Sequence, residues 1–174
     1  MPRHDPVTLA LHWVIALLIA AAYAASGLLE DGPGRSWAMN LHGSLGLLVF
    51  GLSLLRILWR GFARHPAPVA MPALMARIAH LAHVALYVMM VAAPSFGLLA
   101  LWAGGQRVSL FGLLALPSPM TASRGLAEFL QGTHELVANA LVALALLHAA
   151  AAIFHQYILR DHLLERMTPG GKSP

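Results

Sequence analysis

The chain has 174 residues, of which 59% are hydrophobic and only 10% are charged. A soluble domain of this size carries about 25% charged residues, so the composition indicates an integral membrane protein in a single domain. The absence of cysteine excludes disulfides, iron–sulfur clusters and covalently attached c-type haem. The pI of about 10.4 reflects basic residues in short loops rather than a nucleic-acid surface.

Four mainly apolar stretches are long enough to cross a bilayer as helices, which takes about 20 residues. They cover residues 7–29, 41–59, 78–103 and 131–159. The first stretch is interpreted as a retained helix and not a cleaved signal peptide, because it is long and carries His12 and Trp13 early in its apolar run. Pro94 is expected to kink the third. The predicted fold is an all-α four-helix transmembrane bundle.

The segments between the spans contain the glycine and proline typical of turns. Within the longest, Gly104 to Leu130, the stretch Ser109 to Leu116 is apolar and is expected either to lie on the membrane or to cap the bundle. Gly43, Gly46 and Gly51 on the second span would let a partner helix or a flat macrocycle approach the backbone. Both interpretations stay open.

Basic residues near the span ends predict the orientation of the protein, because they concentrate on the cytoplasmic side. With four spans, one side of the membrane carries eight Lys or Arg and the other carries three. The eight are Arg3, Arg56, Arg60, Arg64, Arg77, Arg160, Arg166 and Lys172, and the three are Arg35, Arg107 and Arg124. Both termini are therefore predicted to be cytoplasmic, at what we call the inner end of the bundle.

The last span carries three histidines on one helical face. His134 and His148 are 148 − 134 = 14 residues apart, which is about 21 Å of helical rise and close to four full turns. His155 follows seven residues later and continues the stripe. Because imidazoles inside a membrane are costly unless they are used, this spacing suggests two metal centres layered across the bilayer.

Depth along the spans pairs these histidines with others. His12 and His148 lie equally far from the outer ends of their spans, because 29 − 12 equals 148 − 131. His42 and His134 both lie within three residues of an outer end. Two pairs of neutral imidazoles without thiolate or carboxylate fit two b-type haems, whereas zinc or copper would need further close ligands.

Other side chains near the pairs have competing interpretations. His80 and His83 are interpreted as hydrogen-bonded interfacial histidines, ahead of ligation. His155 lies about two turns too deep to meet His12 and is expected to face the inner interface. Glu135 either orients His134 as a hydrogen-bond acceptor or is simply solvated.

Five segments resemble the bacterial cytochrome b561 family, most closely its superoxide oxidase branch. They are LALHWVIALLIAAAY, NLHGSLGLLVFGLSLLRILWR, RIAHLAHVALYVMMVAAPSFGLL, THELVANALVALALLHAAAAIFHQY and LRDHLLERM. The resemblance implies a di-haem b cytochrome of the bacterial inner membrane, related to the cytochrome b subunits of hydrogenases and formate dehydrogenases. The implied axial ligands are His42 and His134 for the outer haem and His12 and His148 for the inner haem.

The resemblance also implies an activity. Superoxide in the periplasm would give one electron to the outer haem, and the inner haem would reduce ubiquinone beside His155. Arg35, Arg107 and Arg124 are candidates for attracting the superoxide anion, because positive residues around a cleft steer anions. As ordinary loop charges they would be offset by Glu30, Asp31 and Glu128. Asp161 and His162 are weaker candidates for proton entry near His155.

Two other functions stay open. The protein could keep its haems but take electrons from a periplasmic redox partner, as the membrane subunit of a hydrogenase- or dehydrogenase-like complex. An exposed apolar patch on the outer loop would favour that function. Alternatively, it could be a small transporter or scaffold whose histidines line a proton path, in which case the purified protein would be colourless.

Overall fold

Four long helices make up most of the computed structural model, which describes residues 4–28, 35–63 and 71–168. They are α1 (Pro6–Ser26), α2 (Arg35–Phe62), α3 (Ala73–Ala103) and α4 (Arg124–Phe154). All four are long and apolar enough to cross a membrane. The prediction of an all-α four-helix transmembrane bundle is confirmed.

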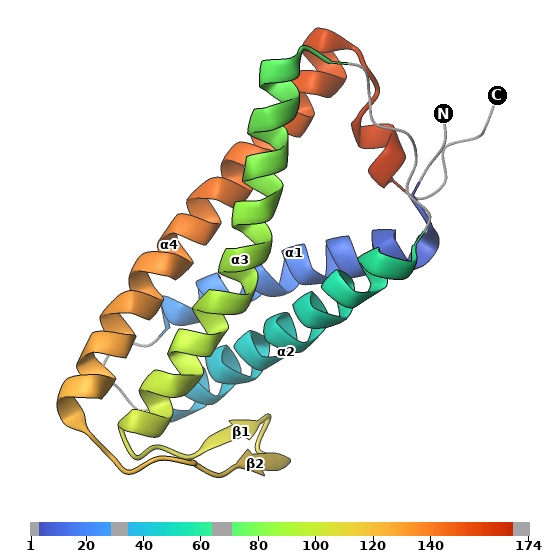
Figure 1. Cartoon of the computed structure of the whole chain (residues 1–174). Helices are drawn as coiled ribbons and strands as arrows, with labels where there is room; N and C mark the ends of the chain where they lie inside the picture. The colour runs from blue at the N-terminus through green and yellow to red at the C-terminus, as the bar shows by residue number, and fades with distance from the viewer. Residues whose placement is uncertain (1–3, 29–34, 64–70, 169–174) are drawn as a thin grey trace.

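The helices form two antiparallel pairs, α1 with α2 and α3 with α4 (Figure 1). The pairs lie together at the end of the molecule that carries the two short strands, and they lean apart toward the opposite, inner end (Figure 1). Contact between α1 and α4 is slight. The inner ends of the two pairs are joined by the chain that follows α4, where Met167 O accepts a hydrogen bond from the Trp13 indole at 2.7 Å.

Three helices begin earlier than the apolar pattern predicted. α2 begins at Arg35 instead of residue 41, α3 at Ala73 instead of residue 78, and α4 at Arg124 instead of residue 131. Hydropathy marks only the part of a helix that lies in hydrocarbon, about 30 Å thick, whereas helical hydrogen bonding continues through the polar headgroup zone. The connections between the helices are therefore shorter than predicted. α3 runs through Pro94 as one continuous helix.

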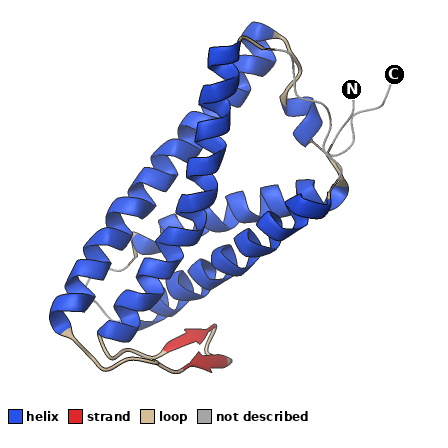
Figure 2. Ribbon diagram, in the orientation of Figure 1, coloured by secondary structure: helices blue, strands red, loops and turns tan. Residues whose placement is uncertain are grey.

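The apolar stretch within the longest connection forms a β-hairpin docked on α2 (Figure 2). Strands β1 (Val108–Leu110) and β2 (Leu114–Leu116) pair antiparallel. The hydroxyl of Ser44 on α2, which is fully buried, accepts the backbone N–H of Phe111 at 2.7 Å and donates to the carbonyls of Asn40 and Ser109. The hairpin thus caps the outer end of α2, one of the two expected outcomes.

An apolar layer of side chains lies between the two histidine levels of the bundle. Ile15, Met90, Ala93 and Leu141 form a buried cluster. Leu141 lies midway along α4 between the levels, because 141 − 134 equals 148 − 141. Apolar packing there keeps the two histidine pairs distinct.

Candidate functional site

The outer histidine pair comes from α2 and α4. The ring centroids of His42 and His134 are 5.9 Å apart. Each Nδ1 lies against a backbone carbonyl, His42 on Ala22 at 2.9 Å and His134 on Ala93 at 2.8 Å. A carbonyl can only accept, so both Nδ1 atoms carry the proton and both Nε2 atoms present a free lone pair, which is the tautomer a metal-bound imidazole needs.

Gly97 on α3 makes room for the His134 ring. A Cβ at this position would lie 3.0 Å from Nδ1 and 3.1 Å from Cε1 of His134. With any larger residue here, the His134 ring or α3 would have to shift by a few tenths of an ångström. Sequence reasoning missed both Gly97 and the two carbonyl acceptors, and Glu135 does not orient His134, because it accepts a hydrogen bond from Gln131 instead.

A cavity of about 890 Å³ opens beside the outer pair. Its lining includes His42, His134 and Gly46, with Arg35 and Gln106 among its polar members and Ile19, Val49 and Leu141 among its apolar ones. The volume falls in the upper part of the range of ligand cavities, about 300–1,000 Å³. A Cβ on Gly43, Gly46 or Gly51 would meet no atom within 4 Å. These glycines therefore do not serve close helix packing here, and Gly46 leaves space for a ligand.

The inner level holds three imidazoles instead of two. The ring centroids of His12 and His148 are 6.4 Å apart, and that of His83 is 5.2 Å from that of His148. Two imidazoles on opposite sides of one metal, with metal–nitrogen bonds of about 2 Å, have centroids about 6 Å apart. This spacing matches His12 with His148 and is wider than that between His83 and His148. From the sequence, His83 competes for the inner level, although an interfacial role ranks ahead of ligation. Both His80 and His83 are exposed.

The ring nitrogen that carries the proton differs between the inner and the outer histidine level. The Arg56 guanidinium lies 3.0 Å from Nδ1 of His12. Because a guanidinium only donates, Nδ1 accepts and the proton of the neutral ring sits on Nε2. The outer pair therefore fits an axially ligated haem as it stands, and the inner pair fits one once Arg56 leaves Nδ1. Among the described residues, no group of three His, Asp or Glu is arranged to hold a bare metal ion.

The three outer arginines occupy different positions. Arg35 lines the large cavity, and Arg107 lines a smaller one of about 110 Å³. Met39, Leu101 and Gln106 line both cavities. Arg124 is strongly exposed and forms an ion pair with Glu128 at 2.8 Å, which offsets its charge. Glu30 and Asp31 lie outside the described residues.

At the inner end, His155 is held by an acid. Nδ1 of His155 lies 2.5 Å from the Asp161 carboxylate, and both side chains are largely buried, at 16% and 21% exposed. The second carboxylate oxygen accepts the backbone N–H of Leu163. The local fold creates this contact, because α4 widens into the π-helical turn η1 (His155–Leu159) and the chain reverses at Arg160 and His162, both with positive φ.

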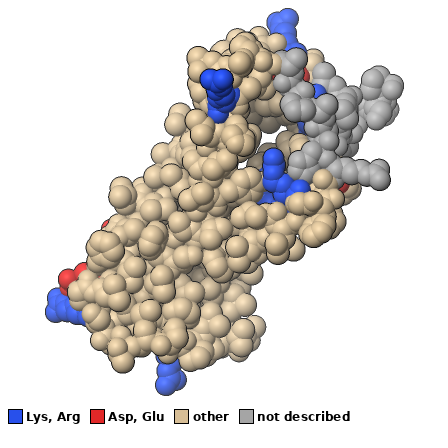
Figure 3. All heavy atoms as spheres, in the orientation of Figure 1, with Lys and Arg blue, Asp and Glu red and all other residues tan. Residues whose placement is uncertain are grey.

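Charged side chains concentrate toward the two ends of the face seen in Figure 3, with a broad area free of them between. This distribution suits a protein whose middle lies in hydrocarbon. Of the inner-end basic residues, Arg3, Arg64 and Lys172 lie outside the described residues. Together, the four apolar helices and the histidine pairs between them define a membrane protein built like a cytochrome b.

Comparison with known proteins agrees with this class. The family described as "Prokaryotic cytochrome b561" matches residues 3–170 of the chain. A "Probable superoxide oxidase CybB" of Yersinia pestis is 31% identical over 172 residues, covering 96% of both chains. "Cytochrome b561 homolog 2" of Escherichia coli K12 is 30% identical over 98% of this chain and 93% of its own length. "Cytochrome b562" of Cereibacter sphaeroides is 30% identical over 95% of both.

The chain belongs to the prokaryotic cytochrome b561 family. It is a multi-pass membrane protein of electron transfer, and its family implies b-type haem.

Proposed function

We propose that this protein binds two b-type haems and carries electrons from periplasmic superoxide to ubiquinone. The observation that carries the proposal is the stacking of two imidazole pairs, with centroid separations of 5.9 and 6.4 Å, across the apolar thickness of the bundle. His42 and His134 would hold the outer haem, and His12 and His148 the inner one. When bound, the haems supply one-electron redox centres between the two surfaces.

The outer surface offers a route for a small anion. Arg35 and Arg107 line two neighbouring cavities beside His42 and His134, and positive groups around a cleft raise the association rate of anions. Arg124 contributes less, because Glu128 pairs with it. Superoxide oxidation needs no proton, so access and positive charge suffice there. The name of the Yersinia pestis relative, 31% identical, supports the same substrate.

The inner end offers a group for quinone chemistry, which takes up two protons. With Nδ1 of His155 donating to Asp161, Nε2 is the atom left to face a quinone carbonyl. A proton on Nε2 would be donated to the quinone carbonyl, first in this hydrogen bond and then outright. His162, which pairs with Glu165, lies outside this contact. The orientation, with this end in the cytoplasm of a bacterial inner membrane, is part of the proposal.

A pulse of superoxide on purified, air-oxidised protein tests the function. We expect haem absorption to report fast reduction, and reoxidation only when ubiquinone is present. Arg107→Gln should slow the reduction and weaken its dependence on ionic strength, whereas Arg124→Gln, whose charge is already offset, should do so much less. A red protein whose haems ignore superoxide would rule out the proposed donor.

That negative outcome would favour a second candidate, a membrane subunit that takes electrons from a periplasmic redox protein. One feature supports it: the turn of the outer hairpin exposes large apolar side chains, with Leu113 90% and Leu114 57% exposed. Exposed apolar clusters of this kind mark protein or lipid contacts. Reduction of the haems by a dehydrogenase-type partner, lost in Leu113→Ser, would establish this candidate.

A further inference from the structure

Two guanidinium groups share one tyrosine ring at the inner histidine level. Arg56 and Arg60 lie one turn apart on α2, with their Cζ atoms 5.7 and 5.9 Å from the centroid of Tyr87 on α3. Arg56 Nε also donates to the Tyr87 hydroxyl at 3.3 Å. Cation–π contact stabilises each guanidinium, but a ring with no net charge does not neutralise the two positive charges.

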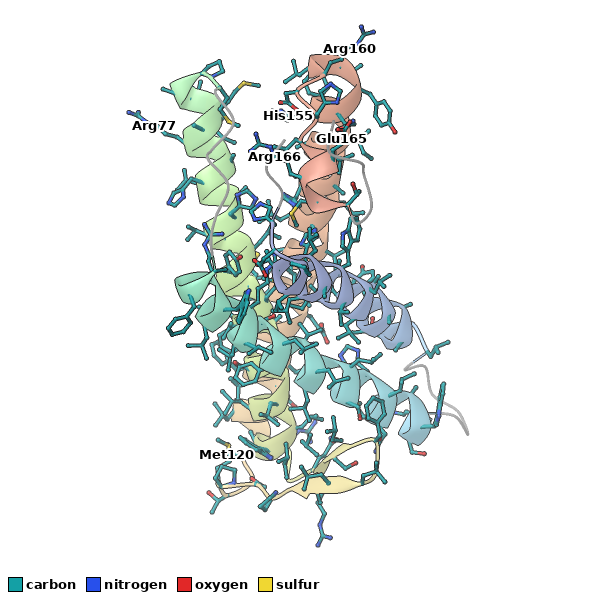
Figure 4. The ribbon with its side chains drawn as sticks, turned by 90° about the vertical axis from the view of Figure 1, so that its right-hand side faces the viewer. Arg77, Met120, His155, Arg160, Glu165 and Arg166 are labelled. Atoms are coloured by element: carbon teal, nitrogen blue, oxygen red, sulfur yellow. The ribbon has the colours of Figure 1, made fainter. Side chains whose placement is uncertain are left out.

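The acids of the inner end are engaged elsewhere. Asp5 accepts from the backbone and hydroxyl of Thr8 and from the Trp59 indole. Partial burial raises the pKa of Asp5, but these hydrogen bonds outweigh it and lower the pKa below its usual value. Asp161 holds His155. Glu165 accepts from Gln156 and His162, and its carboxylate lies with His155 at the far end of α4 (Figure 4). In the described ranges, no ion pair joins Arg56 or Arg60 to a carboxylate.

Such an arrangement calls for an anion from outside the chain. Arginines within membrane segments pair with acids or line a functional site, and Arg56 is only half-exposed. The ligand must also be compatible with His12, whose Nδ1 is contacted by Arg56. If His12 ligates a metal through Nε2, its Nδ1 carries a proton, and two donors would then face each other. An anion that draws Arg56 away would remove this conflict.

We propose that Arg56 and Arg60 form the binding site for the two propionate carboxylates of the inner haem, an inference that rests on the two-haem function above. The haem supplies the two negative charges that the site lacks. Arginine suits this task because its planar fork binds a carboxylate through two parallel hydrogen bonds. Arg56 is then the residue that selects a dicarboxylate macrocycle at the inner level, and Tyr87 positions the Arg56 guanidinium.

A lipid phosphate is the other source of the same chemistry. Arg60 is exposed and lies near the inner end of α2, where long basic side chains reach the headgroups. Arg56 decides between the two sources, because it contacts His12 directly at 3.0 Å and lies a full turn deeper. We therefore assign the site to the haem carboxylates.

The test compares natural haem with its dimethyl ester, which has the same ring but no carboxylate charge. Holoprotein in nanodiscs is mixed with excess apomyoglobin, and haem transfer is followed by absorbance. The emptied site is refilled with natural haem or with the dimethyl ester, and the transfer to apomyoglobin is measured again for each. Wild type is compared with Arg56→Gln, Arg56→Lys and Arg60→Gln. The matched control is Arg77→Gln, which removes an exposed inner-end charge on α3.

We expect wild type to carry two haems per chain and to release the inner diester at least about tenfold faster than natural haem. Arg56→Gln should abolish that difference, and Arg56→Lys should keep part of it, since it keeps the charge without the fork. The outer haem and Arg77→Gln should behave as wild type. The redox midpoint potential of the inner haem should fall in Arg56→Gln, because a nearby positive charge favours the reduced state.

Two results would overturn the assignment while leaving the two-haem function intact. One is equal release of haem and diester in wild type that carries two haems. The other is a dependence of release on anionic lipid in the nanodisc, without dependence on esterification, which would assign the arginines to headgroups. Wild type with fewer than two haems per chain would instead refute the two-haem function and this inference together. The diester comparison needs no variant, so it stands even if Arg56→Gln fails to fold.

Discussion

His42 and His134 differ from His12 in what their Nδ1 atoms contact. Backbone carbonyls fix the tautomer of the outer pair, and a carbonyl of a packed helix cannot rearrange without breaking that helix. Arg56, a side chain, sets the tautomer of His12 and can move. The outer level therefore presents the tautomer that a metal-bound imidazole needs, while at the inner level the tautomer of His12 depends on where the Arg56 side chain lies.

Replacing one histidine at a time should separate the two levels. His42→Ala or His134→Ala should remove the outer haem and block oxidation of the donor, while the inner haem stays reducible from the quinone side. His12→Ala or His148→Ala should remove the inner haem and stop quinone reduction. Haem content per chain and low-temperature spectra measure each loss.

The exposed His80 provides the matched control for these variants, and His80→Ala should keep both haems. His83→Ala should also keep two haems, since its ring lies nearer to that of His148 than the about 6 Å expected for two imidazoles on opposite sides of one metal. If His83→Ala lost a haem and His12→Ala did not, the inner ligand assignment would have to be exchanged.

Gly97→Ala should weaken the outer haem without touching a ligand. The added Cβ would lie 3.0 Å from Nδ1 of His134, so the ring must leave the carbonyl of Ala93 or α3 must shift. Loss of such a supporting hydrogen bond typically costs about 10–100-fold in metal affinity. Haem release to apomyoglobin measures the change. Gly125→Ala on α4, where a Cβ meets nothing within 4 Å and which does not line the large cavity, should leave the release rate unaltered.

At the scale of helices and strands, hydropathy and spacing predicted the four helices but not their ends. Burial in hydrocarbon is a local property of the sequence, so the existence of each span could be inferred directly. Helix ends are set by caps and by packing, as where Asp5 caps α1 by accepting the Thr8 N–H. The docking of the β-hairpin on α2 could likewise not be predicted, because it depends on a contact between Ser44 and Ser109, which are 65 residues apart in the sequence.

The depth count predicted that His12 and His148 share a level, although its reference points are not the helix ends. Counted from Ser26 and Arg124, the observed outer ends of α1 and α4, the two histidines no longer match, because 26 − 12 is much smaller than 148 − 124. Their rings nevertheless lie 6.4 Å apart. Measured from this shared level, α4 extends further toward the outer end than α1, so the apolar limits were better markers of depth than the helix ends.

The residues that contact these histidines could not be predicted by counting depth along the spans. Arg56 contacts His12 and Tyr87 from another helix, and Gly97 contacts His134 across the bundle. These contacts arise where α2 packs on α1 and α3 and where α3 packs on α4, which no spacing within one helix reveals.

His155, at the π-helical end of α4, is predicted to take part in the reduction of quinone. His155→Ala should keep both haems and lower the rate of quinone reduction by about 10²–10⁴-fold, the usual contribution of a general acid. Asp161→Asn should keep the hydrogen bond but lose the charge, and should reduce the rate by about tenfold. Stopped-flow reoxidation of the reduced haems by ubiquinone measures both.

The pair His162 and Glu165 supplies the control for this end, since it is a similar contact on the exposed side. His162→Ala should leave quinone reduction unchanged. Unaltered rates in both His155→Ala and Asp161→Asn would move the quinone site elsewhere, and loss of a haem in His155→Ala would mean that the inner ligands were wrongly assigned.

For the whole molecule, the balance of basic residues predicts which end faces the cytoplasm. Eight Lys or Arg belong to one side and three to the other, and this asymmetry orients helical membrane proteins during insertion. The proposed mechanism depends on this orientation, because superoxide would have to meet the level of His42 from the periplasm while protons reach His155 from the cytoplasm.

The lack of native cysteine makes this orientation directly measurable. Ser118→Cys places a thiol after the outer hairpin, and Thr168→Cys places one after η2 (Leu164–Met167), the short 3-10 helix at the inner end. In cells with a permeabilised outer membrane, a membrane-impermeant maleimide should label Ser118→Cys at once and Thr168→Cys only after the inner membrane is opened. The reverse order would put the arginine-lined cavities in the cytoplasm. The outer haem could then not meet periplasmic superoxide, and the direction of electron flow proposed here would have to be inverted.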